Sequence, residues 1–408
     1  MILIHFLTIV SFVFIDQETV AAKVIRPIVF LPALGMSVLK ADIDGSKYTY
    51  TGGPLCRPLL RSSYTLWLDP LRLLPGRIHC LLHDLSMVYE EREDRFANVP
   101  GVSVNVSFFG KALALDTDLT ALDWIGRQVL YLQKLVDYLS SRGYTPGKDF
   151  RAAPYDFRKG HDEELVIKLK ALVEESYESN GQQRVVLMGH SLGGVLGTHF
   201  LQAQPHDWKN KYIDRWVAIS APLAGSVDAI DVLATGNLFQ ISLPYATDDL
   251  LRAVRSVPVP YYLLPNSNGW SDSHVLLEIE GVKFGLQDYE TFFQLIRSPH
   301  GERVVQGTAS ERLNLSHPGV DVSCIYSLGL QTTSTLVYKD KKDFPLNPAR
   351  QQSDGDSTVP KSSLETCLRW SSDHRFNFQK TILSGVSHMD AVRDDRALHA
   401  IYQAVRGD

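Results

Sequence analysis

One stretch of this chain constrains its fold more than any other: "RVVLMGHSLGGVLGTHF", residues 184–200. An apolar run at 185–188 leads into Ser191, which stands among glycines, and a second apolar segment follows at once. The pattern G-x-S-x-G between a buried strand and a helix predicts a nucleophile elbow, a sharp and strained turn that exposes the serine hydroxyl. Glycines leave room for the neighbouring backbone, and the helix N-terminus offers free N–H groups to negative charge. Ser191 is therefore the candidate nucleophile.

The rest of the chain alternates between two kinds of apolar pattern. Buried strands are predicted, besides that at 184–188, at residues 26–35, 214–222, 320–329 and 376–385. Apolar residues at spacings of three and four predict helices at residues 121–141, 162–178 and 391–405. Strands that alternate with helices indicate an α/β fold with a mainly parallel sheet. The 408 residues, 44% hydrophobic and 21% charged, suit one large domain with insertions or two domains.

A serine is a weak nucleophile without a base and an acid that orients the base. In α/β-hydrolases the chain order is serine, acid, histidine. Asp354 and Asp356 follow the predicted strand at 320–329, and His388 follows the strand at 376–385. Taken one by one, the aspartates suit a solvated turn and the histidine an ordinary surface position. Together with the elbow and the chain order, they favour a catalytic triad.

The N-terminus predicts export. Residues 2–15 are almost wholly apolar, and the small residues before position 23 suit cleavage by signal peptidase after Ala22. A membrane anchor is the alternative, but the run is shorter than the ~20 residues that a spanning helix needs. We therefore expect residues 1–22 to be a signal peptide, which places the mature chain, residues 23–408, in the secretory pathway.

Charge and sequons agree with an exported protein. The signal peptide removes two of 46 acidic residues and no Lys or Arg, so 44 acidic and 41 basic residues leave a net charge of −3. Such a balance gives no indication of nucleic-acid binding. "NVS" at Asn105 and "NLS" at Asn314 are glycosylation sequons.

The cysteines of the mature chain are four in number: Cys56, Cys80, Cys324 and Cys367. No CxxC pair occurs, so a zinc cluster is not expected. An even count in a secreted chain predicts disulfides, and three pairings are possible. Sequential pairing closes the shortest loops.

At this point the sequence resembles one family, the lecithin:cholesterol acyltransferase and group XV lysosomal phospholipase family. The resemblance covers nearly all of the mature chain. The motifs that carry it are "PIVFLPALGMSVLKA" at 27–41, "TLWLDP" at 65–70, "AAPYDFR" at 152–158, "GHSLGG" at 189–194, "DGDSTV" at 354–359 and "SHMD" at 387–390.

The resemblance implies an α/β-hydrolase and assigns roles within it. It makes Asp356 the acid and His388 the base, and it takes the backbone N–H groups of Leu34 and Leu192 as oxyanion donors. This sequence departs from the family's Pro-Gly-x-x-Gly loop, because Ala33 replaces the first glycine. The donor is a backbone group, so the side chain need not matter. The family's two disulfides imply Cys56–Cys80 and Cys324–Cys367.

Two additions to the hydrolase core are also implied. One is a membrane-binding segment at 56–80, with Leu66, Trp67 and Leu68 as interfacial residues, although core packing would suit these three equally well. The other is a cap at 225–310, with "GNLFQISLPY" at 236–245 as its lid.

The implied activity is serine-dependent acyl transfer from a glycerophospholipid, through an acyl-enzyme, to water or a lipid alcohol. It would take place on a phospholipid membrane or lipoprotein surface, without metal or cofactor. The alternatives are phosphatidylcholine-sterol acyl transfer on lipoproteins, a neutral lipase, and a non-catalytic lipid carrier, against which the intact Ser, Asp and His argue. The lipoprotein enzyme of this family carries a Pro-rich C-terminal tail. The present chain ends soon after the predicted helix at 391–405, which favours the lysosomal type over the extracellular one.

Overall fold

The computed structural model of the chain describes residues 25–50, 52, 56, 63–111, 131–160, 162–237 and 247–407. The predicted signal peptide, the first half of the predicted helix at 121–141 and most of the predicted lid lie outside the described residues.

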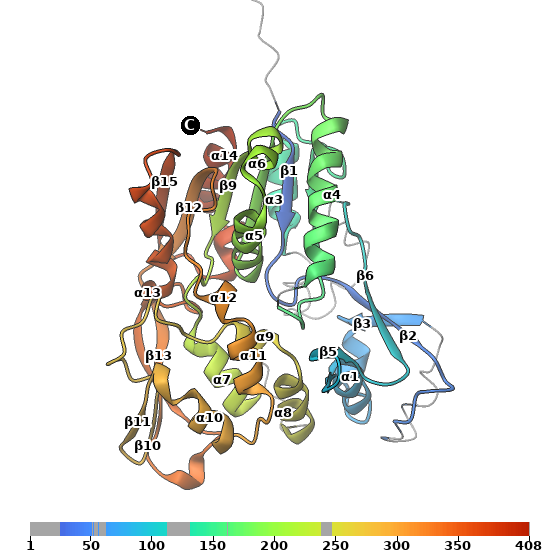
Figure 1. Cartoon of the computed structure of the whole chain (residues 1–408), viewed down its shortest axis with the longest axis vertical. Coiled ribbons are helices and arrows are strands. Elements are labelled where there is room, and N and C mark those ends of the chain that lie inside the picture. Colours follow the sequence, from blue (N-terminus) through green and yellow to red (C-terminus); the bar gives the residue numbers. More distant parts are fainter. Residues whose placement is uncertain are drawn as a thin grey trace, which may run out of the picture.

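A sheet of six parallel strands forms the centre of the molecule (Figure 1). Its order is β15-β12-β9-β8-β1-β7. The strands are β1 (Ile28–Leu31), β7 (Phe150–Ala152), β8 (Val185–His190), β9 (Ile213–Ile219), β12 (Asp321–Leu328) and β15 (Phe378–Ser384). Five of them lie where buried strands were predicted. The central strands are mainly apolar runs, because a parallel sheet that is covered on both faces needs them, whereas the edge strand β15 is only partly buried. The sixth, β7, was not predicted.

Helices cover both faces of this sheet (Figure 1). On one face lie α4 (Glu163–Ser179), α5 (Leu192–Ala203) and α6 (His206–Tyr212), and on the other lie α3 (Gln133–Ser140) and α14 (Asp395–Arg406). Successive residues of β1 alternate between the two cores, since strand side chains point to opposite faces. Val29 and Leu31 belong to the core under α4 and α5, whereas Ile28 and Phe30 belong to the core under α3 and α14.

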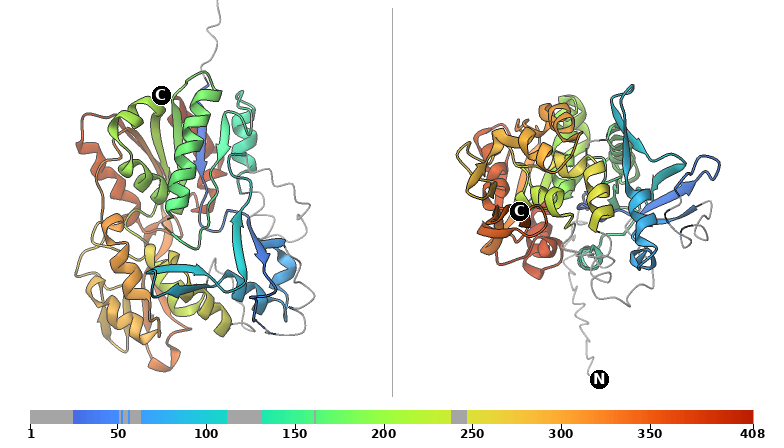
Figure 2. Two further views of the ribbon diagram at one scale, coloured as in Figure 1. Left: turned by 45° about the vertical axis from the view of Figure 1, so that its right-hand side comes forward. Right: turned by 90° about the horizontal axis from the view of Figure 1, so that it is seen from below.

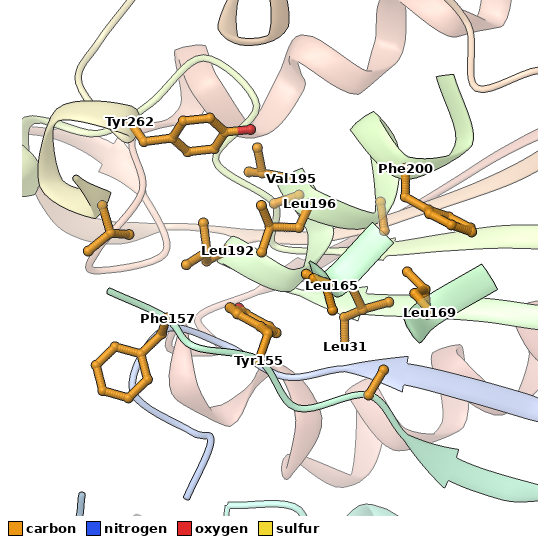
Figure 3. Close-up of a cluster of buried hydrophobic side chains, with 14 of the residues drawn as sticks. Leu31, Tyr155, Phe157, Leu165, Leu169, Leu192, Val195, Leu196, Phe200 and Tyr262 are labelled. Carbon is orange, nitrogen blue, oxygen red and sulfur yellow. The ribbon is translucent and has the colours of Figure 1, made fainter. Parts of the chain in front are cut away.

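The core under α4 and α5 fixes the helix that follows the candidate nucleophile. Figure 3 shows Leu165 and Leu169 of α4 beside Leu196 and Phe200 of α5, with Leu31 of β1 in the same cluster. Burying each such side chain stabilises the fold by about 1.5–3 kcal/mol. The orientation of α5, and with it the elbow, is therefore set by packing.

A second group of strands and helices lies beyond the carboxyl ends of the central strands (Figures 1 and 2). Its four strands, in the order β11-β10-β13-β14, are β10 (Leu277–Ile279), β11 (Val282–Phe284), β13 (Leu330–Tyr338) and β14 (Ala349–Gly355). Its helices are α7 (Val227–Thr235), α8 (Thr247–Ser256), α9 (Val259–Tyr262), η4 (Leu286–Asp288), α10 (Tyr289–Leu295), α11 (Gly301–Gly307) and α12 (Ala309–Arg312).

The cap predicted at residues 225–310 supplies only part of this second sheet. That range supplies β10 and β11, but their partners β13 and β14 come from residues 330–355. Such pairing joins strands across long stretches of chain, which periodicity cannot reveal. This four-stranded sheet, β11-β10-β13-β14, is called the cap sheet below. Its last strand, β14, ends at Gly355, directly before Asp356.

A smaller unit is built from the N-terminal part of the chain (Figure 2). It contains an antiparallel sheet of β2 (Leu39–Ile43), β3 (Ser63–Trp67) and β6 (Val102–Val106), a hairpin of β4 (Met87–Glu90) and β5 (Arg95–Asn98), and the helices η2 (Pro70–Leu73) and α1 (Ile78–Leu85). The remaining short helices are η5 (Lys341–Asp343), α13 (Lys361–Leu364), η6 (Glu365–Ser372) and η7 (Met389–Val392). Both implied disulfides, Cys56–Cys80 and Cys324–Cys367, are present.

The structure corrects the residues expected at a membrane interface. Leu66 is fully buried and Trp67 is 8% exposed, because β3 pairs with β2 and packs onto the hydrolase core. The indole N–H of Trp67 donates to the carbonyl oxygen of Gly35 at 2.7 Å, and Leu68 is half-buried. The exposed apolar side chains lie just beyond, at Leu71 (60%) and Leu74 (49%).

Two further sequence features can be placed. Asn105 is exposed on β6, where its Nδ2 donates to Asp42 at 2.7 Å, and Asn314 is partly buried after α12. Glycosylation of either stays a prediction. Within the described ranges, no helix has the length and apolar character needed to cross a bilayer.

Candidate active site

Ser191 occupies the turn between the end of β8 and the start of α5. Its φ of 56° and ψ of −124° lie in a region that non-glycine residues rarely adopt. The backbone N–H of Ser191 donates to the carbonyl oxygen of Ile219 at 3.0 Å, which holds the turn against β9. This is the strained strand-to-helix geometry that the motif predicts.

Two glycines of the motif are required by close approach. A Cβ atom on Gly193 would lie 2.3 Å from the carbonyl oxygen of Leu31, at the end of β1. A Cβ atom on Gly197 would lie 2.3 Å from the ring of the buried Trp216. Both distances are far below van der Waals contact, so only glycine lets α5 lie directly on β1 and β9.

His388 and Asp356 complete a continuous chain of hydrogen-bonding groups with the serine. The Nε2 atom of His388 lies 2.8 Å from Ser191 Oγ, and its Nδ1 atom lies 2.7 Å from Asp356 Oδ2. The other carboxylate oxygen accepts the N–H groups of Thr358 (3.1 Å) and Val359 (2.7 Å). Asp356 is fully buried and His388 is 4% exposed. The carboxylate therefore fixes the Nδ1–H tautomer, which leaves Nε2 free to take the serine proton.

Asp354 has a different place. It is exposed on β14, and its Oδ1 atom accepts the N–H of Gly329 at 2.7 Å. The structure brings Asp356, and not Asp354, to the histidine.

The two predicted oxyanion donors lie in segments that meet at the start of α5. In the described part of the chain, the N–H groups of Leu34 and Leu192 have no hydrogen-bond acceptor. Leu192 is the first residue of α5, where the N–H groups of a helix have no partner within it. The close approach of Gly193 to the end of β1 brings this N-terminus against the loop that carries Leu34. The pair can therefore receive negative charge that develops near Ser191 Oγ.

Charge around His388 favours its protonated form. Burial lowers its pKa, but the charge and hydrogen bond of Asp356, together with the charge of Asp228, outweigh burial and raise the pKa above 6.5. A general base must be neutral before it acts, so catalysis is expected to gain as the pH rises through this pKa.

Asp228 is a site residue that the sequence did not reveal. It lies in the first turn of α7, and its N–H donates to the Oγ atom of Ser226 at 3.3 Å. Ser226 Oγ in turn donates to the carbonyl oxygen of Thr358, 2.7 Å away, in the loop that holds the catalytic acid. An acidic residue after a serine N-cap is ordinary at a helix start, so no sequence signal could have set this one apart.

The environment of Asp228 perturbs its ionisation. Burial first, and then the charge of Asp231, raise its pKa to about 7, with a smaller contribution from Asp356. The positive charges of His388 and Arg350 oppose this shift. Asp228 and His388 thus stabilise each other's charged forms. Among the described residues, no group of three or more His, Cys, Asp or Glu side chains could hold a metal ion.

The first prediction separates the two aspartates. Asp356→Asn should lower the rate of ester hydrolysis by roughly 10³–10⁴, because an amide favours the wrong histidine tautomer. Asp354→Asn, the matched control on an exposed strand, should lose less than about tenfold. Steady-state rates on a soluble ester measure both, and the reverse order would exclude Asp356 as the orienting acid.

A second prediction concerns the pH profile. Asp228→Asn removes a negative charge that raises the pKa of His388, so the acid limb of kcat/KM on a soluble ester should move to lower pH. Asp354→Asn should leave that limb in place. The measurement is kcat/KM from pH 4.5 to 8, and an unchanged or upward-shifted limb in Asp228→Asn would contradict the coupling.

Comparison with known proteins agrees with the geometry. The profile of the lecithin:cholesterol acyltransferase family matches residues 63–310 and 309–395. The lysosomal phospholipase A and acyltransferase of Rattus norvegicus is 33% identical over 378 residues, which cover 91% of this chain and 88% of that one. The phosphatidylcholine-sterol acyltransferase of the same species is 29% identical over 385 residues, 94% of this chain and 85% of that one.

A solved structure supports the fold alone. A chain of the Tle4-Tli4 complex matches with a TM-score of 0.55 at 14% identity, over 93% of this chain and 98% of that one. Together, the α/β-hydrolase sheet, the elbow and the family profile lead to one conclusion: the chain belongs to the lecithin:cholesterol acyltransferase family.

Proposed function

We propose that this chain is a serine-dependent phospholipid acyl hydrolase and transacylase that works through an acyl-enzyme on Ser191. The observation that carries the proposal is the connection from Ser191 Oγ through His388 to Asp356, with distances of 2.8 and 2.7 Å. The names of the two relatives, a phospholipase A and acyltransferase and a phosphatidylcholine-sterol acyltransferase, supply the substrate class.

The first half of the reaction forms the acyl-enzyme. As Ser191 Oγ attacks the carbonyl carbon of a phospholipid ester, its proton passes to Nε2 of His388. Asp356 stabilises the imidazolium that results, and the N–H groups of Leu34 and Leu192 bind the oxyanion. When the tetrahedral intermediate collapses, the bond to the glycerol oxygen breaks. That oxygen takes the proton from Nε2, and a lysophospholipid leaves.

The second half transfers the acyl group. Water or the hydroxyl of a lipid alcohol gives its proton to Nε2 of His388 and attacks the acyl carbonyl carbon. The bond to Ser191 Oγ then breaks, and Oγ recovers the proton. Water yields a fatty acid, whereas a lipid alcohol yields a new ester.

An apolar cavity beside the oxyanion loop suits a fatty acyl chain. Its volume is about 70 Å³, and Leu34 lies in its wall. The rest of the wall is almost entirely apolar and comes from the smaller unit, α1 and α8, with these residues among others: Trp67, Leu73, Leu81, Phe157, Leu250 and Val254. Burying methylene groups is worth about 0.8 kcal/mol each. Such a cavity therefore favours a hydrocarbon chain beside the loop that carries Leu34.

The membrane contact is proposed at the neighbouring turn. Leu71 and Leu74 are exposed, whereas Leu73 between them forms part of the cavity wall. Exposed leucines beside a lipid-binding cavity would let the enzyme take substrate from a membrane or lipoprotein surface.

We place the enzyme in the lysosome or outside the cell, reached through the secretory pathway. His206, His374 and His399 are exposed at the surface, where positive charge favours binding to anionic lipid. Not every histidine contributes, because burial lowers the pKa of His190 and of His317.

The proposal is tested with vesicles that contain phosphatidylcholine, an anionic lipid, and either ceramide or cholesterol. Wild type should release fatty acid and form an acylated alcohol in at least one set, and Ser191→Ala should form neither. Binding of lipid without any product in wild type would instead identify a lipid carrier. Acylation of cholesterol alone would favour the sterol acyltransferase.

The same vesicles test the compartment. Activity should be higher at pH 5 than at pH 7 and should fall at high salt, since salt screens charge beyond ~8 Å. A soluble ester should show the opposite pH trend, because only the protonation of His388 matters there. Vesicle activity that peaks at neutral pH and ignores salt would exclude an acid compartment.

A further inference from the structure

A second chain of hydrogen-bonding groups runs behind the triad. The backbone N–H of Ala33 donates to the hydroxyl oxygen of Tyr131 at 3.2 Å. The Tyr131 hydroxyl lies 2.5 Å from Nδ1 of His190, and Nε2 of His190 lies 2.9 Å from the carbonyl oxygen of His388. Tyr131 is 2% exposed and His190 is fully buried, so water does not compete for these partners.

The direction of every hydrogen bond in this chain is determined. A carbonyl oxygen can only accept, so Nε2 of His190 must carry the proton that binds His388. Burial, and then the positive charge of His388, lower the pKa of His190 well below 6.5, so its ring is neutral and Nδ1 has no proton. Nδ1 must therefore accept from the Tyr131 hydroxyl, whose oxygen accepts the N–H of Ala33.

The two ends of this chain of hydrogen bonds lie next to groups with different roles in the proposed reaction. Ala33 directly precedes Leu34, a proposed oxyanion donor, and His388 is the proposed base. The residue in the middle, His190, directly precedes the nucleophile. His388 is held from its other side too, because its backbone N–H donates to the carbonyl oxygen of Asp356 at 2.7 Å.

We propose that Tyr131 and His190 are positioning residues that fix the oxyanion loop and the catalytic histidine relative to the nucleophile. Neither touches the reacting atoms. They act by holding Ala33 at one end and His388 at the other, through groups whose donor and acceptor roles permit only one arrangement. This inference rests on the proposed serine mechanism.

Ring contacts support a fixed arrangement. The ring of Tyr131 stacks on that of His190 with centroids 5.6 Å apart, and the ring of His190 lies 5.1 Å from that of His388. The three rings therefore form one buried column, in which a shift of one ring displaces the next.

Tyr131→Phe tests the proposal, because it removes one oxygen and keeps the ring. We expect kcat on a soluble ester to fall by roughly 10- to 100-fold, since small misplacements of catalytic groups have effects of this size. KM should change less than about twofold. The matched control is Tyr138→Phe, the same change seven residues along, at a hydroxyl for which the described structure shows no hydrogen bond. Its kcat should equal that of wild type.

Two substitutions of His190 separate the two ends. In His190→Gln the amide nitrogen can replace Nε2 and keep the bond to His388, but the bond to Tyr131 is lost. Tyr131→Phe combined with His190→Gln should therefore cost little more than either alone, because both break the same link. In His190→Asn the link to His388 is lost instead, so Tyr131→Phe should add a further loss. If the losses caused by Tyr131→Phe and His190→Gln were additive, the proposed link between Tyr131 and His190 would be excluded.

The wild-type protein provides a measurement that does not depend on whether variants fold. The ¹⁵N-labelled imidazole of His190 should stay neutral and in its Nε2–H form from pH 5 to 8. A titration in that range or an Nδ1–H tautomer would overturn the proposal, as would equal kcat for Tyr131→Phe and Tyr138→Phe. Failure of a fluorophosphonate to label Ser191 in wild type would instead reject the serine mechanism itself.

Discussion

The contact between the start of α5 and the end of β1 is the constraint on which the rest of the site depends. It exists because Gly193 has no side chain, and it holds Ser191 at a φ of 56°. A backbone strained in this way costs about 1–3 kcal/mol and persists only where its surroundings over-determine it. Here the buried apolar face of α5 over-determines it. The same contact brings the N–H of Leu192 towards the loop of Leu34, so one approach of helix to strand positions both the proposed nucleophile and the proposed oxyanion donors.

The proposed acid reaches the site by a different route, through the cap. Asp356 follows the last strand of the cap sheet, and α7 is joined to that segment at two points. Ser226 donates to Thr358 at 2.7 Å, and the guanidinium of Arg350 binds Asp231 with two hydrogen bonds of 2.8 and 3.0 Å. The cap therefore supports the proposed catalytic site, because a displacement of α7 would also displace the segment that carries Asp356.

The sequence predicted the local chemistry well and the long-range pairing poorly. Five strands of the main sheet, the elbow and the chain order of serine, acid and histidine follow from short patterns, whereas the choice of Asp356 over Asp354 came from the family resemblance. The structure brings Ser191, Asp356 and His388 together. The pairing of β10 with β13 could not be predicted, because strand pairing across the chain leaves no local signal. For Trp67 the sequence left an interface and a core equally open, and the structure buries the side chain. Asp228 and the link from Tyr131 to His190 could not be found, since both depend on residues that meet only in the folded chain.

The central claim is that Ser191 carries the acyl group between donor and acceptor. Rapid chemical quench of the enzyme with phosphatidylcholine that bears a ¹³C-labelled acyl chain, followed by proteolysis and mass spectrometry, tests it directly. We expect a labelled acyl group on the peptide that contains Ser191, formed faster than product and consumed when a lipid alcohol is added. An acyl group on another residue, or product formation with no acyl-enzyme at any quench time, would contradict it.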